Sequence, residues 1–141
     1  MQIAIDPVSN VPLYQQLRDR VVEGIASGEL SAGEPLAPVR QLAAQFGINP
    51  ATVAKGYDLL RAEGLLLTHR TAGSVVARGP QNAPWHADAE ADWSARLRTL
   101  LAEAVAQGMP DDGILRHARS ALQTFSAARP TSDSTTKEDS R

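Results

Sequence analysis

The sequence contains no cysteine and no long apolar run. Without cysteine, the chain can form no disulfide, no thiolate zinc site and no cysteine nucleophile. No apolar run approaches the ~20 residues that a membrane-spanning helix needs. The first residues lack the basic start and the apolar middle of a signal peptide, so we expect a cytoplasmic protein.

An excess of positive charge is also lacking. The chain has 14 Lys and Arg residues against 16 Asp and Glu residues, which gives a formal net charge of −2. Residues 1–80 carry seven charges of each sign and are neutral as a whole. A surface that binds nucleic acid would therefore have to be locally basic, through the placement of its charges. This balance disfavours a non-specific chromosome-packing protein.

Enzyme motifs are missing as well. The histidines at 69, 86 and 117 do not stand at metal-ligand spacing, and no HExxH, EF-hand or glycine-rich phosphate loop occurs. Asp111 and Asp112 form a carboxylate pair, but at a helix start they stabilise the positive end of the helix dipole. We therefore predict that the chain is not an enzyme and has no metal site and no cofactor.

Residues 46–53 end one helix and begin the next. Gly47 can adopt the left-handed conformation that ends a helix, Asn49 is a strong N-cap, and Pro50 suits the first helical position. The apolar residues around this turn form one stripe before it and one after it: Val39, Leu42, Ala43 and Phe46, then Val53, Tyr57 and Leu60. The pattern predicts a helix-turn-helix, with residues 50–63 as the helix that enters the major groove of DNA.

Other elements are expected on both sides of this motif. Apolar residues spaced by four predict a helix over 13–27. Residues 65–69 and 74–77 are short apolar runs that predict two strands, with 70–73 as the tip of a hairpin. The three leucines from 65 could instead continue the preceding helix, but the flanking glycines favour a strand. Three helices and a hairpin predict a winged helix-turn-helix over residues 1–79.

The remaining residues predict a second, helical region. Residues 80–87, which follow Gly79 and contain two prolines, are predicted to be a linker, 88–126 an α-helical hairpin, and 127–141 a disordered tail. A hairpin of this size cannot bury both apolar stripes within itself, so we expect a second copy of the chain to cover them. The predicted dimerisation residues are Trp93, Leu97, Leu100, Leu101, Ala104, Ile114, Leu115, Ala118, Leu122 and Phe125. The predicted fold class is mainly α with a small β wing.

Several segments together form a recognisable signature: 12–17, 28–36, 39–43, 47–53, 60–66 and 73–76. In this combination, over just over half of the chain, the sequence resembles the DNA-binding domain of the GntR family of bacterial transcription regulators. The short two-helix end resembles that of the YtrA-like subgroup. The resemblance implies a homodimeric repressor that binds a two-fold symmetric operator, often of its own operon.

The sequence departs from the family pattern at three places. Ala37-Pro38 stands where the family usually has Pro-Ser, so a hydroxyl that could cap the helix and bind phosphate is lost. Pro50 replaces a frequent Arg and cannot reach a base. Thr71-Ala72-Gly73 replaces the Gly-x-Gly that is usual at the wing tip.

The predicted DNA-binding residues are Arg40, Asn49, Ala51, Thr52, Lys55, His69, Arg70, Thr71 and Gly73. The resemblance gives Arg40 a DNA contact, since a guanidinium can grip phosphate or guanine with two hydrogen bonds. Thr52 could contact a phosphate or a thymine methyl, or could cap its helix, and both interpretations stay open. Lys55 is interpreted as a DNA contact rather than a solvated charge, and Asn49 as a cap rather than a base reader.

The wing supplies the remaining candidates. His69 and Arg70 could reach the minor groove or a flanking phosphate, and Arg70 is the better candidate, because a histidine by itself is more often an ordinary strand residue. Arg61 and Arg78 are interpreted as surface charges. Tyr14 and Tyr57 are interpreted as core residues.

The pattern as a whole predicts a sequence-specific, double-stranded-DNA-binding transcriptional regulator, most simply a homodimeric repressor. The alternative is a winged-helix module that uses its neutral surface to bind another protein. A small-molecule effector is left open, because a pocket for one could be built only between the C-terminal helices or across the dimer.

Overall fold

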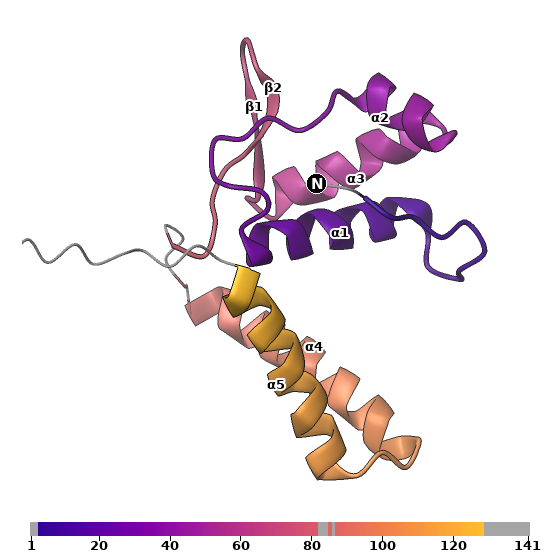
Figure 1. Cartoon of the computed structure of the whole chain (residues 1–141), viewed down its shortest axis with the longest axis vertical. Coiled ribbons are helices and arrows are strands. Elements are labelled where there is room, and N and C mark those ends of the chain that lie inside the picture. The colour runs from indigo at the N-terminus through magenta and orange to yellow at the C-terminus, as the bar shows by residue number, and fades with distance from the viewer. Residues whose placement is uncertain (1–2, 82–84, 86, 129–141) are drawn as a thin grey trace, which may run out of the picture.

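The computed structural model describes residues 3–81, 85 and 87–128, and these form five helices and one two-stranded sheet (Figure 1). The elements follow one another as α1 (Leu13–Ser27), α2 (Val39–Phe46), α3 (Pro50–Ala62), β1 (Leu66–His69), β2 (Gly73–Val76), α4 (Ala87–Ala106) and α5 (Asp111–Ala128). The predicted class, mainly α with a small β wing, is confirmed. Most of the predicted tail, from residue 129 on, lies outside the described residues.

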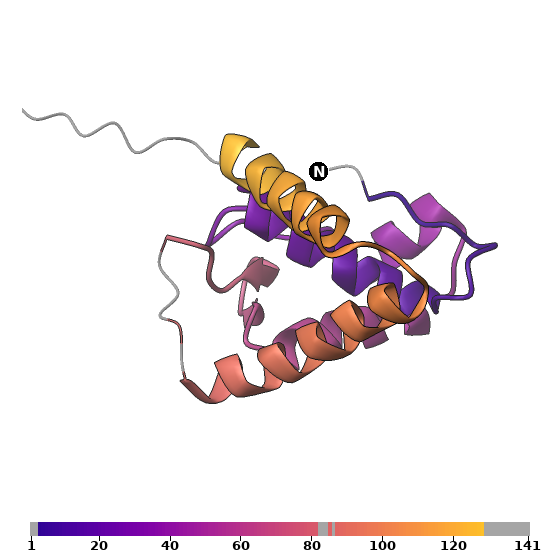
Figure 2. The same cartoon turned by 90° about the horizontal axis from the view of Figure 1, so that it is seen from below.

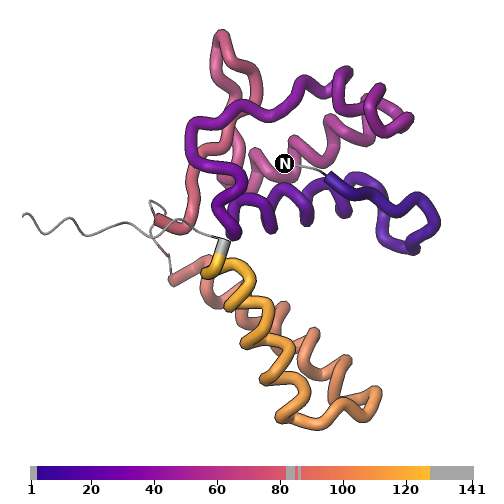
Figure 3. The backbone as a smooth tube through the Cα atoms, in the orientation of Figure 1, coloured from indigo at the N-terminus to yellow at the C-terminus, as the bar shows by residue number. Residues whose placement is uncertain are grey.

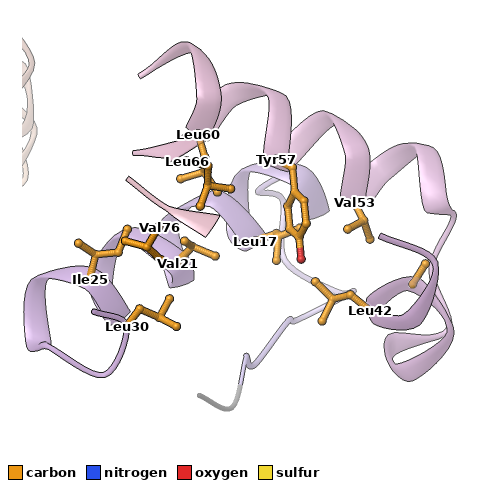
Figure 4. Close-up of a cluster of buried hydrophobic side chains, with 11 residues drawn as sticks. Leu17, Val21, Ile25, Leu30, Leu42, Val53, Tyr57, Leu60, Leu66 and Val76 are labelled. Atoms are coloured by element: carbon orange, nitrogen blue, oxygen red, sulfur yellow. The ribbon is translucent and has the colours of Figure 1, made fainter. Parts of the chain in front are cut away.

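One hydrophobic core joins α1, α2, α3 and the hairpin (Figure 4). Its largest fully buried side chains are Leu17, Val21, Val53, Tyr57, Leu60 and Val76. The two longer helices, α1 and α3, cross closely at Gly56, where an added Cβ would lie 3.1 Å from the carbonyl oxygen of Tyr14. The apolar stripes that the sequence predicted are therefore the faces that build this core.

The turn between α2 and α3 has the predicted form. Gly47 adopts the left-handed conformation with φ 65°, and the Asn49 side chain accepts a hydrogen bond of 2.9 Å from the N–H of Ala51. Pro50 is the first residue of α3. At the other end of α2, Pro38 takes the cap position and no side chain caps the helix. The loss of the family's capping hydroxyl is thus visible in the structure.

The wing is an antiparallel hairpin that projects beyond the helices (Figure 3). Gly64, with φ 74°, ends the helical stretch, so the leucine run does not continue α3. The segment 33–36 runs beside β2. Leu36 N–H donates a hydrogen bond to the carbonyl oxygen of Ser74, and Val76 N–H donates one to the carbonyl oxygen of Glu34. The base of the wing is therefore fixed on one side by the loop that leads into α2.

The two C-terminal helices diverge from their connecting turn (Figure 2). Instead of packing along its whole length on α4, α5 crosses back and contacts α1 (Figure 1). No residue of α4 is buried. Over the described ranges, no helix combines the length and the apolar character needed to span a membrane.

Candidate nucleic-acid interface

The candidate surface consists of the start of α3, the start of α2 and the tip of the wing. In Figure 1 these parts lie at the end of the molecule opposite to α4 and α5. The first turn of α3 presents N–H groups and the positive end of the helix dipole, which together favour an anion such as phosphate. Ala51 is exposed and Thr52 half-buried on this turn.

The structure shows which of Asn49 and Thr52 caps α3. The cap of α3 is Asn49, whose side-chain oxygen is occupied by the N–H of Ala51. Thr52 donates its own N–H to the Asn49 carbonyl, at 2.9 Å. Its hydroxyl makes no hydrogen bond within the described residues, so the second-cap interpretation of Thr52 is wrong.

The Lys55 side chain packs over an aromatic ring instead of extending into solvent. Its ammonium nitrogen lies 3.9 Å from the centre of the Tyr14 ring, which is a cation–π contact between α3 and α1. Such a contact is worth roughly 0.5–1 kcal/mol at an exposed site. Tyr14 is only half-buried, so its interpretation as a core residue is wrong: one face of the ring supports Lys55.

Tyr57 is the core tyrosine that the sequence predicted. It is 1% exposed, and its hydroxyl donates a 2.6 Å hydrogen bond to the carbonyl oxygen of Ala37. Burial raises the pKa of Tyr57 to about 12, and the nearby charge of Arg61 opposes this rise. The bond ties α3 to Ala37, two residues before the start of α2, and so helps to fix the start of α2 against α3.

Arg40 and Arg70 are two cations of the candidate surface that are available for an anionic partner. Both side chains belong to exposed residues, one on the first turn of α2 and the other at the tip of the wing. Neither forms a salt bridge or a side-chain hydrogen bond within the ranges that the structure describes. Contact with DNA would therefore break no existing ion pair of either side chain.

His69 organises the wing tip and is more than an ordinary strand residue. Its Nδ1 atom accepts hydrogen bonds of 3.3 Å from the N–H groups of Thr71 and Ala72, and lies 3.2 Å from the Thr71 hydroxyl. Gly73 follows with φ 72°, a conformation that side chains disfavour. The tip is thus shaped by one imidazole and one glycine.

Arg61 is a residue that the sequence interpretation missed. Its guanidinium donates to Asp58 Oδ1 at 2.7 Å, to Thr68 Oγ1 at 3.1 Å and to Ser74 Oγ at 2.8 Å. The interpretation as a solvated surface charge is therefore wrong. The Asp58–Arg61 spacing of three was a readable signal for a local pair, but the two hydroxyls become visible only with the register of the hairpin.

Two further arginines brace the domain outside the candidate surface. Arg18 of α1 grips the carboxylate of Glu63 with hydrogen bonds of 2.8 and 3.1 Å. Burial lowers the pKa of Arg18, but the bonds to Glu63 and Asp19 outweigh burial and raise it overall. The Arg78 guanidinium packs against Gly64, where an added Cβ would lie 3.3 Å from it. Arg78 is therefore part of the packing, against its interpretation as a surface charge.

Six of the ten predicted dimerisation residues line one groove of about 440 Å³ between α4 and α5. These residues are Leu97, Leu100, Leu101, Ala104, Ile114 and Ala118. Trp93 is not among them, and its ring meets Trp85 edge to face with 6.2 Å between ring centres. Leu115 and Leu122 are exposed on α5 outside the groove. The divergence of the two helices leaves this apolar surface open.

Comparison with sequences identifies the domain. The model of bacterial regulatory proteins, gntR family, matches residues 13–76. The chain is 37% identical over 75 residues to the HTH-type transcriptional repressor YtrA of Bacillus subtilis, which is 53% of this chain and 58% of the relative. It is 34% identical over 76 residues to the HTH-type transcriptional regulator Rv1152 of Mycobacterium tuberculosis, or 54% and 63% of the two chains. The chain thus spans about three-fifths of the length of these curated relatives.

Solved structures agree over more of the chain. YtrA from Sulfolobus acidocaldarius, described as a GntR-family transcription factor, is similar with a TM-score of 0.57 at 34% identity, over 74% of this chain and 97% of that one. A protein of Listeria monocytogenes EGD-e described as a transcriptional antiterminator shares the fold, with a TM-score of 0.79 at 24% identity over 89% and 92% of the two chains. The sequence relatives are regulators rather than enzymes, as the sequence predicted. The chain therefore belongs to the GntR family of bacterial regulatory proteins, and residues 13–76 form its DNA-binding domain.

Proposed function

We propose that the chain is a transcriptional repressor that acts in the cytoplasm and binds, as a homodimer, an operator with two-fold symmetry. The observation that carries the proposal is that Arg40, on the first turn of α2, and Arg70, at the tip of the wing, are exposed and unpaired within the described residues, on the same surface as the exposed first turn of α3. In this proposal α3 lies in the major groove, where Ala51, Thr52 and Lys55 meet base edges or phosphates. The wing tip then follows the neighbouring minor groove or its phosphates.

The exposed apolar surface of the C-terminal helices supports the homodimer. Leu100 of α4 and Leu115 and Leu122 of α5 are each more than 60% exposed, and large apolar side chains are costly to leave in water to this extent. A second copy of the chain offers the same surface, and a two-fold axis would pair each patch with its equivalent. Two α3 helices related by this axis would read an inverted repeat, with half-sites about 10 base pairs apart or a multiple of that.

The charge balance fits a dimer better than a single domain. Residues 1–80 are neutral overall, so one domain that neutralises a few phosphates is expected to bind DNA weakly. Linking two such domains makes the second binding event intramolecular, which raises the overall affinity without any new contact. The relative YtrA of Bacillus subtilis is a transcriptional repressor, which supports repression rather than activation.

The test is selection of an operator from random double-stranded DNA by the full chain, followed by fluorescence anisotropy on the selected site and on a shuffled site. We expect an inverted repeat, with binding that falls as salt rises and that Arg40→Ala weakens about tenfold, the loss of one good guanine or phosphate contact. Arg20→Ala is the matched control, because it removes one charge from the exposed Arg20–Glu23 pair of α1.

Two results would overturn the proposal. Equal binding to selected and shuffled DNA would mean a non-specific DNA-binding protein. Failure of selection, at low salt and with a folded protein, would favour the alternative that the neutral winged-helix surface binds another protein.

A further inference from the structure

Arg61 joins the recognition helix α3 to both strands of the wing. Its Nε atom donates to Thr68 Oγ1 on β1, and its Nη2 atom donates to Ser74 Oγ on β2. Thr68 and Ser74 are directly opposite each other in the register of the hairpin. A single planar group therefore holds one cross-strand pair from the side of α3, in a geometry that the forked guanidinium favours.

The position of this pair along the hairpin matters. Leu66 and Val76, at the base, are 3% and 1% exposed and are fixed by the core. The next pairs outward lose that support on β1, where Leu67 and Thr68 are exposed. The pair held by Arg61 is the last one before His69 and Gly73 close the tip. Arg61 thus acts where core packing has ended and the tip begins.

Asp58 orients Arg61 for this task. It lies one turn earlier on α3 and accepts a 2.7 Å hydrogen bond from Nη1, which leaves Nε and Nη2 directed to the two hydroxyls. The Arg61 side chain is 33% exposed, so it is partly covered rather than free to rotate in water. On its other edge, β2 is held by a backbone hydrogen bond, which Leu36 N–H donates to the carbonyl oxygen of Ser74. On the α3 side, Arg61 adds the bond that reaches β1.

We propose that Arg61 is a positioning residue that fixes the direction of the wing relative to α3. The inference rests on the proposed binding of DNA, because its consequence is the spacing between the contacts of α3 and those of the wing tip. Arg70 follows Thr68 by two residues, at the start of the turn 70–72, so it lies roughly 7 Å beyond the Thr68–Ser74 pair at the rise of a strand. A small rotation at the pair therefore displaces Arg70 by ångströms, enough to lose a phosphate.

The first test measures the free protein and needs no DNA. Because the chain has no cysteine, spin labels can be placed at Thr71→Cys on the tip and Ala44→Cys on α2, both exposed positions. The labelled chain is mixed with an excess of unlabelled chain, so that distances within one copy dominate. We expect Arg61→Ala to broaden the distance distribution between the two labels. An unchanged distribution would overturn the proposal, whether or not the chain binds DNA.

The second test measures affinity for the selected operator. We expect Arg61→Ala and Arg61→Lys to weaken binding alike, by about fivefold, because a lysine keeps the charge but cannot hold both hydroxyls. Added to Arg70→Ala, the change Arg61→Ala should cause little further loss, since the tip contact is already gone. Arg20→Ala, which breaks an equivalent pair at spacing three, should bind like the wild type.

Three outcomes of the second test would contradict the proposal. Wild-type affinity in Arg61→Lys would mean that only the charge of Arg61 matters. If the fold-loss of operator affinity in the Arg61→Ala, Arg70→Ala double variant equals the product of the two single losses, Arg61 contacts DNA by itself. Full affinity in Arg70→Ala would mean that the tip has no contact to position. If the wild type binds no DNA at all, the proposed function fails, and the label distances still decide the role of Arg61 in the wing.

Discussion

The buried hydroxyl of Tyr57 provides a quantitative test of the core of the DNA-binding domain. Tyr57→Phe removes the 2.6 Å hydrogen bond to Ala37 and leaves that carbonyl oxygen without this donor. We expect the free energy of unfolding at neutral pH to fall by about 1 kcal/mol, the usual net worth of one such bond. The ring itself stays in place, so the packing around it should be unchanged.

The alkaline range separates this bond from other causes of instability. Burial raises the pKa of Tyr57 from 10.0 to about 12, so between these values the unfolded chain loses the phenol proton while the folded chain keeps it. The folded state then binds more protons than the unfolded state, and stability falls as pH rises. Full stability is present below pH 10, and the loss amounts to about 1.4 kcal/mol for each pH unit between the unfolded pKa of 10.0 and the folded pKa of about 12.

The assay is urea denaturation of the wild type and Tyr57→Phe at neutral pH and near pH 11. At neutral pH the wild type should have the larger free energy of unfolding. Near pH 11 the difference between the two proteins should be close to zero, because ionisation of Tyr57 in the unfolded chain costs the wild type about 1.4 kcal/mol and cannot occur in Tyr57→Phe. Tyr14→Phe is the control, since that ring is half-buried and its hydroxyl makes no hydrogen bond within the described residues. An advantage of the wild type that does not change with pH would refute the reasoning.

Three further changes test other parts of the structure. Gly56→Ala places a methyl group 3.0 Å from the Leu17 side chain and 3.1 Å from the Tyr14 carbonyl, and should cost about 1–3 kcal/mol of unfolding free energy in urea denaturation. A double-mutant cycle of Lys55→Met with Tyr14→Leu should give a coupling of about 0.5–1 kcal/mol, and no coupling would refute the cation–π contact. Leu100→Glu should weaken the dimer more than tenfold in analytical ultracentrifugation without lowering the melting temperature of the DNA-binding domain, and an unchanged dimer would refute the proposed surface.

The sequence predicted those parts of the fold that depend on near neighbours in the chain. The turn at Gly47, Asn49 and Pro50 is determined by backbone freedom, a local cap and a fixed φ, all within a few residues. Helical periodicity likewise identified the buried faces. These signals act locally, so they could be read without knowing what packs against them.

The finer architecture of the candidate surface could not be read in this way. The bonds of Arg61 depend on the hairpin register, and the contact of Lys55 depends on the crossing of α1 and α3 at Gly56. The role of His69 depends on the conformation of a tip in which Thr71 replaces the first of the two glycines usual in the family. Each involves side chains whose approach is set by tertiary packing, and side-chain type alone does not reveal such partners.

The contact of α5 with α1 has a mechanical consequence. If only the linker joined the DNA-binding domain to α4 and α5, the domain could rotate freely relative to these two helices. Here the last helix also rests on the first helix of the domain, so the two regions are held at two places, one covalent and one packed (Figure 1). A change in the angle between α4 and α5 that keeps the α5–α1 contact would therefore have to move α1, which packs closely on α3 at Gly56.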